Sequence, residues 1–339
     1  MGESSHRNCR VAAGTVSGWR SVVLENDEVR VVVLPDKGAE IHQIVDLRSG
    51  TPVLFEAPWG LRPPGAPPLP GSGNDPFMWN YAGGWQELFP SVNDECTYRG
   101  RRIPFHGEVA SLPWEHEVLH AGGGEARVRF SNRAPGSPFL LERVLLLVEG
   151  EATLFVDEEV RNESAEDAHF VWGQHCVVGP PFLEPGCRLE IPARTIVTST
   201  VLFEPETARL EPGRREPWPL APLRAGGTVD LRDIPGPETG SHDDLYVTDL
   251  EAGWLEVTNP GRELTFRLEW EHELFGWIVL WQPYGGAVAE PLAGSYALGI
   301  EPWSSMLDLE RAVAAGTAVE LAAGASRTTR LQARLLHRP

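Results

Sequence analysis

Short segments in which apolar and polar residues alternate recur along this chain of 339 residues. Every second residue from Leu264 to Trp270 is apolar, and Ala152 to Asp157 alternates in the same way. Val29 to Val33 also alternates, but within a run that is apolar on both faces. Successive side chains of a strand point to opposite faces, so a period of two predicts β-strands.

Turn residues separate these segments, because the chain contains 35 glycines and 30 prolines. Glu149-Gly150-Glu151 follows the apolar run Leu141 to Val148 and predicts a hairpin turn. Only Met306 to Ala315 has helical spacing, and Gly316 is placed to end that helix. We therefore expect an all-β fold, a large antiparallel β-sandwich that forms a single domain over residues 1–339.

Two long segments rich in proline and glycine interrupt the strand pattern. Trp59 to Pro76 lies beside the most aromatic part of the chain, which predicts a loop at the rim of a site. Glu204 to Gly240 is consistent with a linker between domains or with an insertion into one sandwich. We favour the insertion, because the predicted strands before and after it have the same character.

Charge and cysteine content narrow the range of partners and compartments. The chain carries 29 Lys plus Arg against 48 Asp plus Glu, a net charge of −19, so nucleic acid and anionic membrane surfaces are unfavourable partners. No apolar run approaches the length of a membrane helix, and Met1 to Arg10 lacks the apolar centre of a secretion signal. Four scattered cysteines predict free thiols and a cytoplasmic protein.

The most aromatic stretch, Trp79 to Pro90, combines flat rings with amide and carboxylate groups. Such a mixture suits a sugar, whose C–H faces stack on aromatic rings while its hydroxyl groups form hydrogen bonds. Trp85 and Glu87 are its candidate binding residues. The alternative is an aromatic core cluster with a surface glutamate, and these residues alone do not decide between the two.

His106 and Glu108 lie two residues apart, so an extended chain would place both side chains on one face. That pair is half of a possible metal site, but no second His pair or Cys cluster lies nearby to complete it. We expect neither metal nor cofactor.

Two further stretches carry groups that can transfer protons. His175 follows the strand-like run His169 to Gln174, and imidazole exchanges protons near neutral pH. Glu301 interrupts the apolar stretch Tyr296 to Trp303, where burial would raise the pKa of its carboxyl group toward the range of a general base. A structural ion pair is the alternative for Glu301.

In this order the three stretches resemble the aldose 1-epimerase (galactose mutarotase) family, and especially its divergent bacterial branches. The resemblance covers nearly the whole chain, from about Glu25 to the C-terminal strand. It rests on Gly84-Trp85-Gln86-Glu87-Leu88-Phe89-Pro90, His106-Gly107-Glu108 with Trp114, the strand with His175, the Ile300-Glu301-Pro302 strand, and His242-Asp243-Asp244-Leu245-Tyr246-Val247. One departure concerns an arginine that binds sugar hydroxyls in better-known members, since this chain has Gln86 and Glu87 there and Arg101 and Arg102 do not fit the pattern.

The resemblance implies a sandwich enzyme that interconverts the α and β anomers of a free or modified hexose without a cofactor. Glu301 would take the proton of the C1 hydroxyl, His175 would protonate the ring oxygen, and His106 would assist there. Asp243, or its neighbour Asp244, would bind remote hydroxyls.

Trp85, Glu87, Glu108 and Trp303 would line the same pocket. The expected partner is a small sugar, and the sequence leaves a monomer and a homodimer open. Two alternatives remain, a sugar-binding sandwich without catalysis and a lyase or hydrolase on the same fold.

Overall fold

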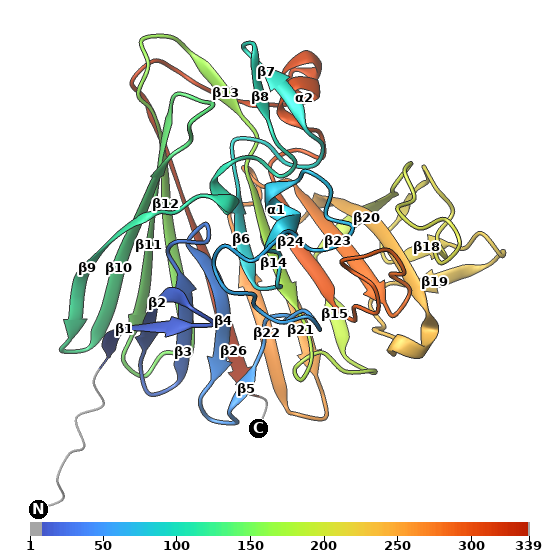
Figure 1. The fold of residues 1–339 in the computed structure, drawn as a ribbon. Coiled ribbons are helices and arrows are strands. Elements are labelled where there is room, and N and C mark those ends of the chain that lie inside the picture. Colours follow the sequence, from blue (N-terminus) through green and yellow to red (C-terminus); the bar gives the residue numbers. More distant parts are fainter. Residues whose placement is uncertain (1–8, 338–339) are drawn as a thin grey trace, which may run out of the picture.

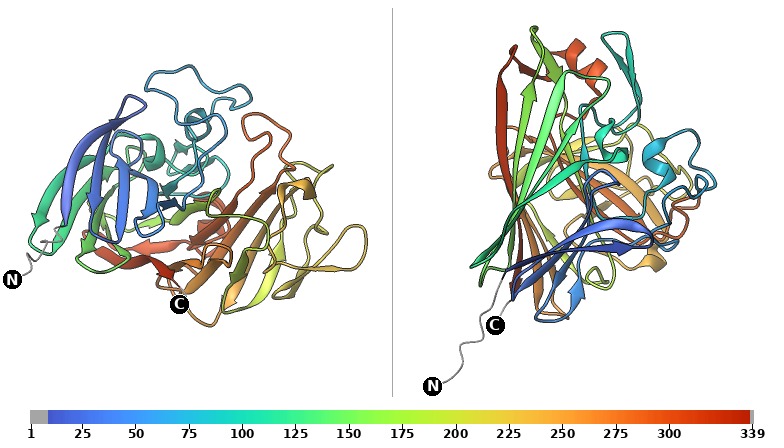
Figure 2. Two further views of the ribbon diagram at one scale, coloured as in Figure 1. Left: turned by 90° about the horizontal axis from the view of Figure 1, so that it is seen from below. Right: turned by 60° about the vertical axis from the view of Figure 1, so that its left-hand side comes forward.

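Two large antiparallel β-sheets form the body of the protein in a computed structural model, which describes residues 9–337. All paired strands in this range run antiparallel, so the predicted sandwich is confirmed. Figures 1 and 2 show the sheets as two layers, with most long connecting segments gathered on the outer side of the larger sheet. That the chain forms a single domain stays a prediction.

The larger sheet has 12 strands, and its central members carry the predicted site residues. Their spatial order is β1 (Arg10–Val16), β2 (Trp19–Glu25), β3 (Val29–Leu34), β4 (Glu40–Asp46), β6 (Trp85–Leu88), β14 (Gly173–Val178), β24 (Leu298–Trp303), β23 (Trp277–Tyr284), β20 (Ser241–Leu250), β16 (Ala193–Thr198) and β17 (Arg215–Pro217), with β5 (Thr51–Pro52) paired to β4.

The smaller sheet has eight strands and includes the predicted Glu149-Gly150-Glu151 hairpin. Its order is β15 (Arg188–Glu190), β21 (Trp254–Asn259), β22 (Leu264–Glu269), β26 (Ser326–His337), β12 (Thr153–Asn162), β11 (Phe139–Val148), β10 (Glu125–Arg133) and β9 (Glu115–Gly122). The remaining strands form three small pairs, β7 (Cys96–Tyr98) with β8 (Arg101–Ile103), β13 (Ala168–Phe170) with β25 (Val319–Leu321), and β18 (Leu220–Pro222) with β19 (Thr228–Asp230).

Helices are short: α1 (Pro76–Trp79), α2 (Leu309–Ala315), and the 3-10 turns η1 (Val109–Ser111) and η2 (Pro237–Thr239). The predicted C-terminal helix is confirmed as α2, which begins three residues later than expected because Asp308 caps its first turn. Gly316 ends it in the left-handed conformation, as predicted. No helix within residues 9–337 is long and apolar enough to span a membrane.

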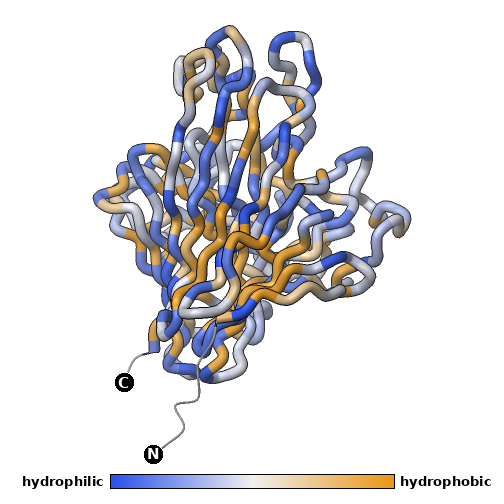
Figure 3. Tube along the Cα trace, turned by 90° about the vertical axis from the view of Figure 1, so that its left-hand side faces the viewer, coloured by the Kyte–Doolittle hydropathy of each residue, from blue (hydrophilic) through white to orange (hydrophobic). Residues whose placement is uncertain are grey.

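The main apolar core lies between the two sheets and draws on alternate residues of facing strands, such as Val31 and Cys176 from one sheet and Leu145 and Leu331 from the other. Figure 3 shows the most hydrophobic segments gathered in the lower centre of the molecule. A second apolar cluster covers the opposite face of the 12-stranded sheet, where Trp281 and Trp303 pack with α1 and α2 residues. The larger sheet is therefore covered on both faces.

The two proline-rich segments lie beside different parts of the larger sheet. The loop Trp59 to Pro76 runs into α1, which lies across β6, β14 and β24 (Figure 1). The segment 199–240 connects β16 and β20, which are neighbours in one sheet. An excursion between adjacent strands fits the predicted insertion. All four cysteines are buried and free.

Candidate active site

His175 and Glu301 lie side by side on the face of the larger sheet that turns away from the main core. Gly173 pairs with Trp303 and Val177 with Gly299, so the antiparallel register sets His175 directly opposite Glu301. The Nε2 atom of His175 is 3.8 Å from Oε1 of Glu301, and both side chains are buried. The structure thus brings the two predicted proton-transfer groups together.

His106 reaches the same place from the loop after β8. Its backbone has φ 61° and that of Gly107 has φ 81°, a left-handed pair that turns the chain sharply. A Cβ atom on Gly107 would lie 2.4 Å from the carbonyl oxygen of Phe89, so only glycine fits this turn. The imidazole ring of His106 lies 5.5 Å from that of His175 and 5.8 Å from the ring of Trp303.

Two aromatic residues from the loop around α1 cover the histidines. The ring of Phe77 lies 4.8 Å from that of His106 and 5.3 Å from that of His175. Tyr81 stacks on Phe77 at 5.5 Å and presents its edge to His175. The sequence missed Phe77, although the position of the loop beside the aromatic stretch was the available signal.

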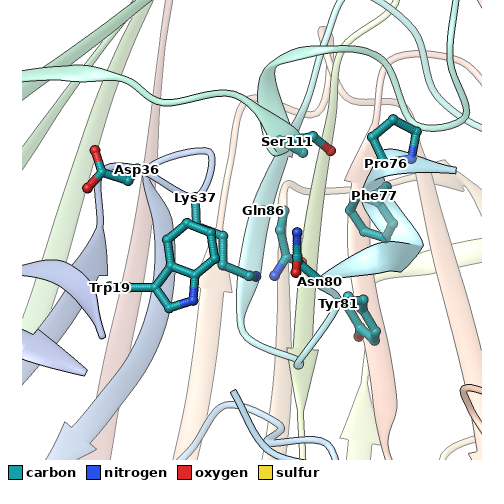
Figure 4. A pocket seen from close by; sticks show the side chains of 10 residues that line it. Trp19, Asp36, Lys37, Pro76, Phe77, Asn80, Tyr81, Gln86 and Ser111 are labelled. Carbon is teal, nitrogen blue, oxygen red and sulfur yellow. The ribbon is translucent and has the colours of Figure 1, made fainter. Parts of the chain in front are cut away.

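A cleft continues from this cluster toward β2 and β3. It is lined by Trp19, Lys37, Asn80, Tyr81, Gln86 and Ser111, among others (Figure 4). The side chains of Lys37 and Gln86 both donate to the buried carboxylate of Glu40, and the Gln86 bond is 2.7 Å. Gln86 pairs in register with His175, so the cleft and the histidines share one face of the sheet.

Several polar atoms at this site are buried without a hydrogen-bond partner. They are Nδ1 of His106, Nδ1 of His175, Oε1 of Gln86, the hydroxyl group of Tyr81 and Nε1 of Trp303. An unmet buried polar group costs about 1–3 kcal/mol, and folded proteins contain few of them. A gathering of five in one place indicates that a hydroxylated ligand or water supplies the missing partners.

Burial sets the charge state of the central pair. It raises the pKa of Glu301 well above its ordinary value, and the nearby carboxylate of Asp244 raises it further. Burial lowers the pKa of His175 to about 4. Burial also holds the pKa of His106 well below its usual range, and repulsion from His175, when that ring is protonated, lowers it further. The neutral forms are therefore favoured, with a proton on Glu301 and none on His175.

Asp244, the alternative to Asp243 in the sequence analysis, is the aspartate on the site face. Burial raises its pKa to about 6. His242 lies two residues before Asp244 in the same strand, and its Nδ1 atom is 2.7 Å from the carboxylate of Glu204. Its Nε2 atom accepts a hydrogen bond from the indole nitrogen of Trp281 at 2.7 Å. Even-numbered residues of β20 therefore face the site.

Asp243 points to the opposite face, which corrects the expectation that it binds the sugar. Its carboxylate accepts hydrogen bonds from the backbone amides of Arg209 and Leu210, at 2.7 and 3.0 Å, and from Nε of Arg209 at 2.8 Å. These contacts hold the inserted segment 199–240 against β20. Asp243 is 3% exposed, and as an odd-numbered residue of β20 it lies on the other face of the sheet from His175 and Glu301.

Trp85 and Glu87 also face the main core, so the expectation that they line the pocket is wrong. Both side chains are fully buried, and the indole of Trp85 donates to Gln174 at 2.7 Å. Glu87 forms an ion pair with Arg143 and accepts hydrogen bonds from Trp172 and Gln174. Gln86, between them in β6, is the residue that faces the site.

Of the two remaining residues predicted to line the pocket, Glu108 does not share the face of His106, and Trp303 lies on the site face. Glu108 has a helical backbone conformation rather than an extended one, and its carboxylate accepts a bond from the Gly136 amide at 2.9 Å. It therefore does not share a face with His106, and the half-site for a metal that their spacing allowed does not form. Trp303 lies on the site face beside His106, while its role in binding stays a prediction.

The described part of the chain, 9–337, contains no group of three or more His, Cys, Asp or Glu side chains arranged to hold a metal ion. The absence of a metal or cofactor requirement remains a prediction that only the protein in solution tests.

Comparisons with known proteins point to one fold. A family described as a domain of unknown function (DUF4432) matches residues 16–335. No curated protein matches significantly.

Solved structures similar to this chain include a putative aldose 1-epimerase from Klebsiella pneumoniae, with 16% identity, TM-score 0.72, and 96% of this chain and 82% of that chain covered. The Slr1438 protein from Synechocystis has 20% identity and a TM-score of 0.67, with 96% of this chain and 99% of that chain covered. A galactose mutarotase related enzyme from Lactobacillus acidophilus has 16% identity and a TM-score of 0.61, with 93% of this chain and 97% of that chain covered. At these identities the likeness shows a galactose mutarotase-like β-sandwich fold.

Proposed function

The chain belongs to the DUF4432 family and has a mutarotase-like fold, and we propose that it is an aldose 1-epimerase that interconverts the anomers of a hexose. The observation that carries this proposal is the buried pair of His175 and Glu301, whose Nε2 and Oε1 atoms lie 3.8 Å apart beneath a loop with unmet polar groups. Mutarotation needs one group that accepts a proton and one that donates it, placed around C1 and the ring oxygen.

The reaction runs through the open-chain aldehyde. The C1 hydroxyl gives its proton to one member of the pair, the bond between C1 and the ring oxygen breaks, and that oxygen takes a proton from the other member. A half-turn about the C1–C2 bond presents the other face of the aldehyde, and the reverse transfers close the ring. His175 and Glu301 together hold one transferable proton, and at the end of each turnover both have returned to their starting protonation states.

The pKa directions favour a starting state in which Glu301 holds that proton and His175 is neutral. In this state Glu301 donates and His175 accepts during ring opening, the reverse of the roles that the resemblance implies. The roles exchange on ring closure, so either order yields the same overall reaction. His106 lies beside His175 and, as a neutral imidazole, forms a hydrogen bond to the sugar.

Glu301→Gln tests the proposal, because it keeps the shape of the side chain and removes its acid–base function. We expect the mutarotation rate of a freshly dissolved α-anomer, followed by polarimetry, to fall at least about a hundredfold. Glu320→Gln is the matched control, since Glu320 is a largely exposed carboxylate, and it should leave the rate unchanged. A near-normal rate in Glu301→Gln contradicts the proposal, and sugar binding without turnover in the parent protein favours a sugar-binding sandwich.

A further inference from the structure

Tyr81 has a buried hydroxyl group whose hydrogen-bonding capacity the protein leaves unused. The residue is 3% exposed, and its oxygen has no partner within the described residues. A buried tyrosine hydroxyl normally finds a partner, and phenylalanine would fill the same space without the cost of an unmet polar group. The hydroxyl group therefore contributes nothing to the ligand-free fold.

Gln86 presents the complementary unmet group in the same cleft. Its side-chain nitrogen donates to Glu40 at 2.7 Å and also to the carbonyl oxygen of Gly83, which fixes the amide with Oε1 left over. Tyr81 and Gln86 both line the cleft, and Figure 4 shows them in the same part of its wall, with Asn80 between them in that view. Gln86 is 2% exposed, so its Oε1 is as deeply placed as the tyrosine hydroxyl.

The two unmet groups differ in chemistry. Burial and the nearby carboxylates of Glu301 and Glu40 raise the pKa of Tyr81 well above its usual range, so its hydroxyl remains protonated and can donate. The Oε1 atom of Gln86 can only accept. An alcohol is donor and acceptor at once, so one alcohol group between the two satisfies both.

We propose that Tyr81 and Gln86 bind one hydroxyl group of the sugar, with Tyr81 as donor and Gln86 as acceptor, and that they position the ring against His175 and Glu301. This inference rests on the proposed function and adds two positioning residues to it. Tyr81 also touches the ring of His175 at 5.5 Å, and Gln86 is its partner across β6 and β14. A hydroxyl held here is therefore adjacent to the proton-transfer pair.

Tyr81→Phe removes only the hydroxyl group and tests the proposal. A neutral hydrogen bond contributes about 0.5–1.5 kcal/mol, so we expect KM for the sugar to rise about three- to tenfold while kcat stays within about twofold. The melting temperature without sugar should stay the same or rise, because an unmet buried group is lost. A structural role would instead lower it.

A panel of monodeoxy sugars identifies the bound hydroxyl group. The parent enzyme should bind one member of the panel less tightly than the complete sugar, and for that member alone Tyr81→Phe should cause no further loss. Tyr98→Phe is the matched control, since the hydroxyl of Tyr98 accepts a bond from the His169 amide at 2.9 Å outside the site. It should leave KM unchanged for every sugar.

Calorimetric binding, measured beside turnover, separates the two proposals. If the parent turns over sugars and Tyr81→Phe changes neither KM nor Kd for any of them, the positioning role is wrong and the proposed function stands. If the parent binds sugars without turnover, the proposed function is wrong, and the Kd values of Tyr81→Phe still test the positioning role. If no sugar binds, both are overturned.

Discussion

The two faces of the 12-stranded sheet bury similar polar groups in opposite ways. On the core face, Arg143 is fully buried and lies between Glu87 and Glu158, and Gln174 donates to both carboxylates. On the outer face, His175 is buried with an unmet ring nitrogen. The core network is complete and the outer cluster is not. Burial of a charged or polar residue therefore does not mark a functional site by itself, whereas several unmet polar groups gathered in one place make that place a candidate site.

The largest effect expected from this comparison is on stability and comes from the core face. Arg143→Met would leave Glu87 and Glu158 buried without their cation, and removing one partner of a buried ion pair costs about 3–5 kcal/mol. We expect the free energy of unfolding, from urea denaturation, to fall by about that amount. Arg129→Met, which removes a largely exposed ion pair between Arg129 of β10 and Glu117 of β9, is the control and should cost less than about 1 kcal/mol. A loss below 1 kcal/mol in Arg143→Met would show that the core network is not the stabilising one.

The alternation of strands explains which site residues the sequence predicts and which it misses. The order of motifs led to His175, Glu301 and His106, because each lies in its own recognisable stretch. Within a stretch, however, adjacent residues of a strand face opposite sides of the sheet, and a shift of one position exchanges core and site. The motifs thus point to Glu87 where Gln86 faces the site, and to Asp243 where Asp244 does.

The other misses have a different cause. Glu108 leaves the face of His106 because His106 and Gly107 adopt positive φ values, which a glycine permits but a sequence pattern does not require. Phe77 reaches the histidines through a long loop whose path depends on tertiary contacts. The fold itself was predictable, since periodicity and turn residues repeat many times along the chain, and one wrong strand does not change the class.

A second prediction concerns the outer face and acid. The folded protein holds the pKa of His175 at about 4, below the 6.5 of an unfolded histidine, so the unfolded state binds more protons between these values. The contribution of His175 to stability is therefore present above about pH 6.5 and is lost as pH falls to about 4. A shift of this size corresponds to up to about 3 kcal/mol.

We expect His175→Gln to flatten the fall in unfolding free energy between pH 6.5 and 4, measured by urea denaturation at each pH. His272→Gln is the control, because His272 is partly exposed beside Glu273, and its profile should follow that of the parent. An unchanged slope in His175→Gln would mean that His175 titrates as an ordinary histidine, and that the neutral starting state proposed above is wrong.

The smallest expected effects come from the adjacent aspartates of β20, which lie on opposite faces. Asp243→Asn weakens three hydrogen bonds that hold segment 199–240, so we expect a loss of about 1–3 kcal/mol in unfolding free energy with an unchanged pH profile of activity.

Asp244→Asn removes a charge that raises the pKa of Glu301. The pKa of Glu301 should fall, and the alkaline limb of the pH–rate profile, where Glu301 loses its proton, should move to lower pH. The unfolding free energy of Asp244→Asn should not fall. If Asp243→Asn moves the alkaline limb and Asp244→Asn does not, the two faces have been assigned the wrong way round.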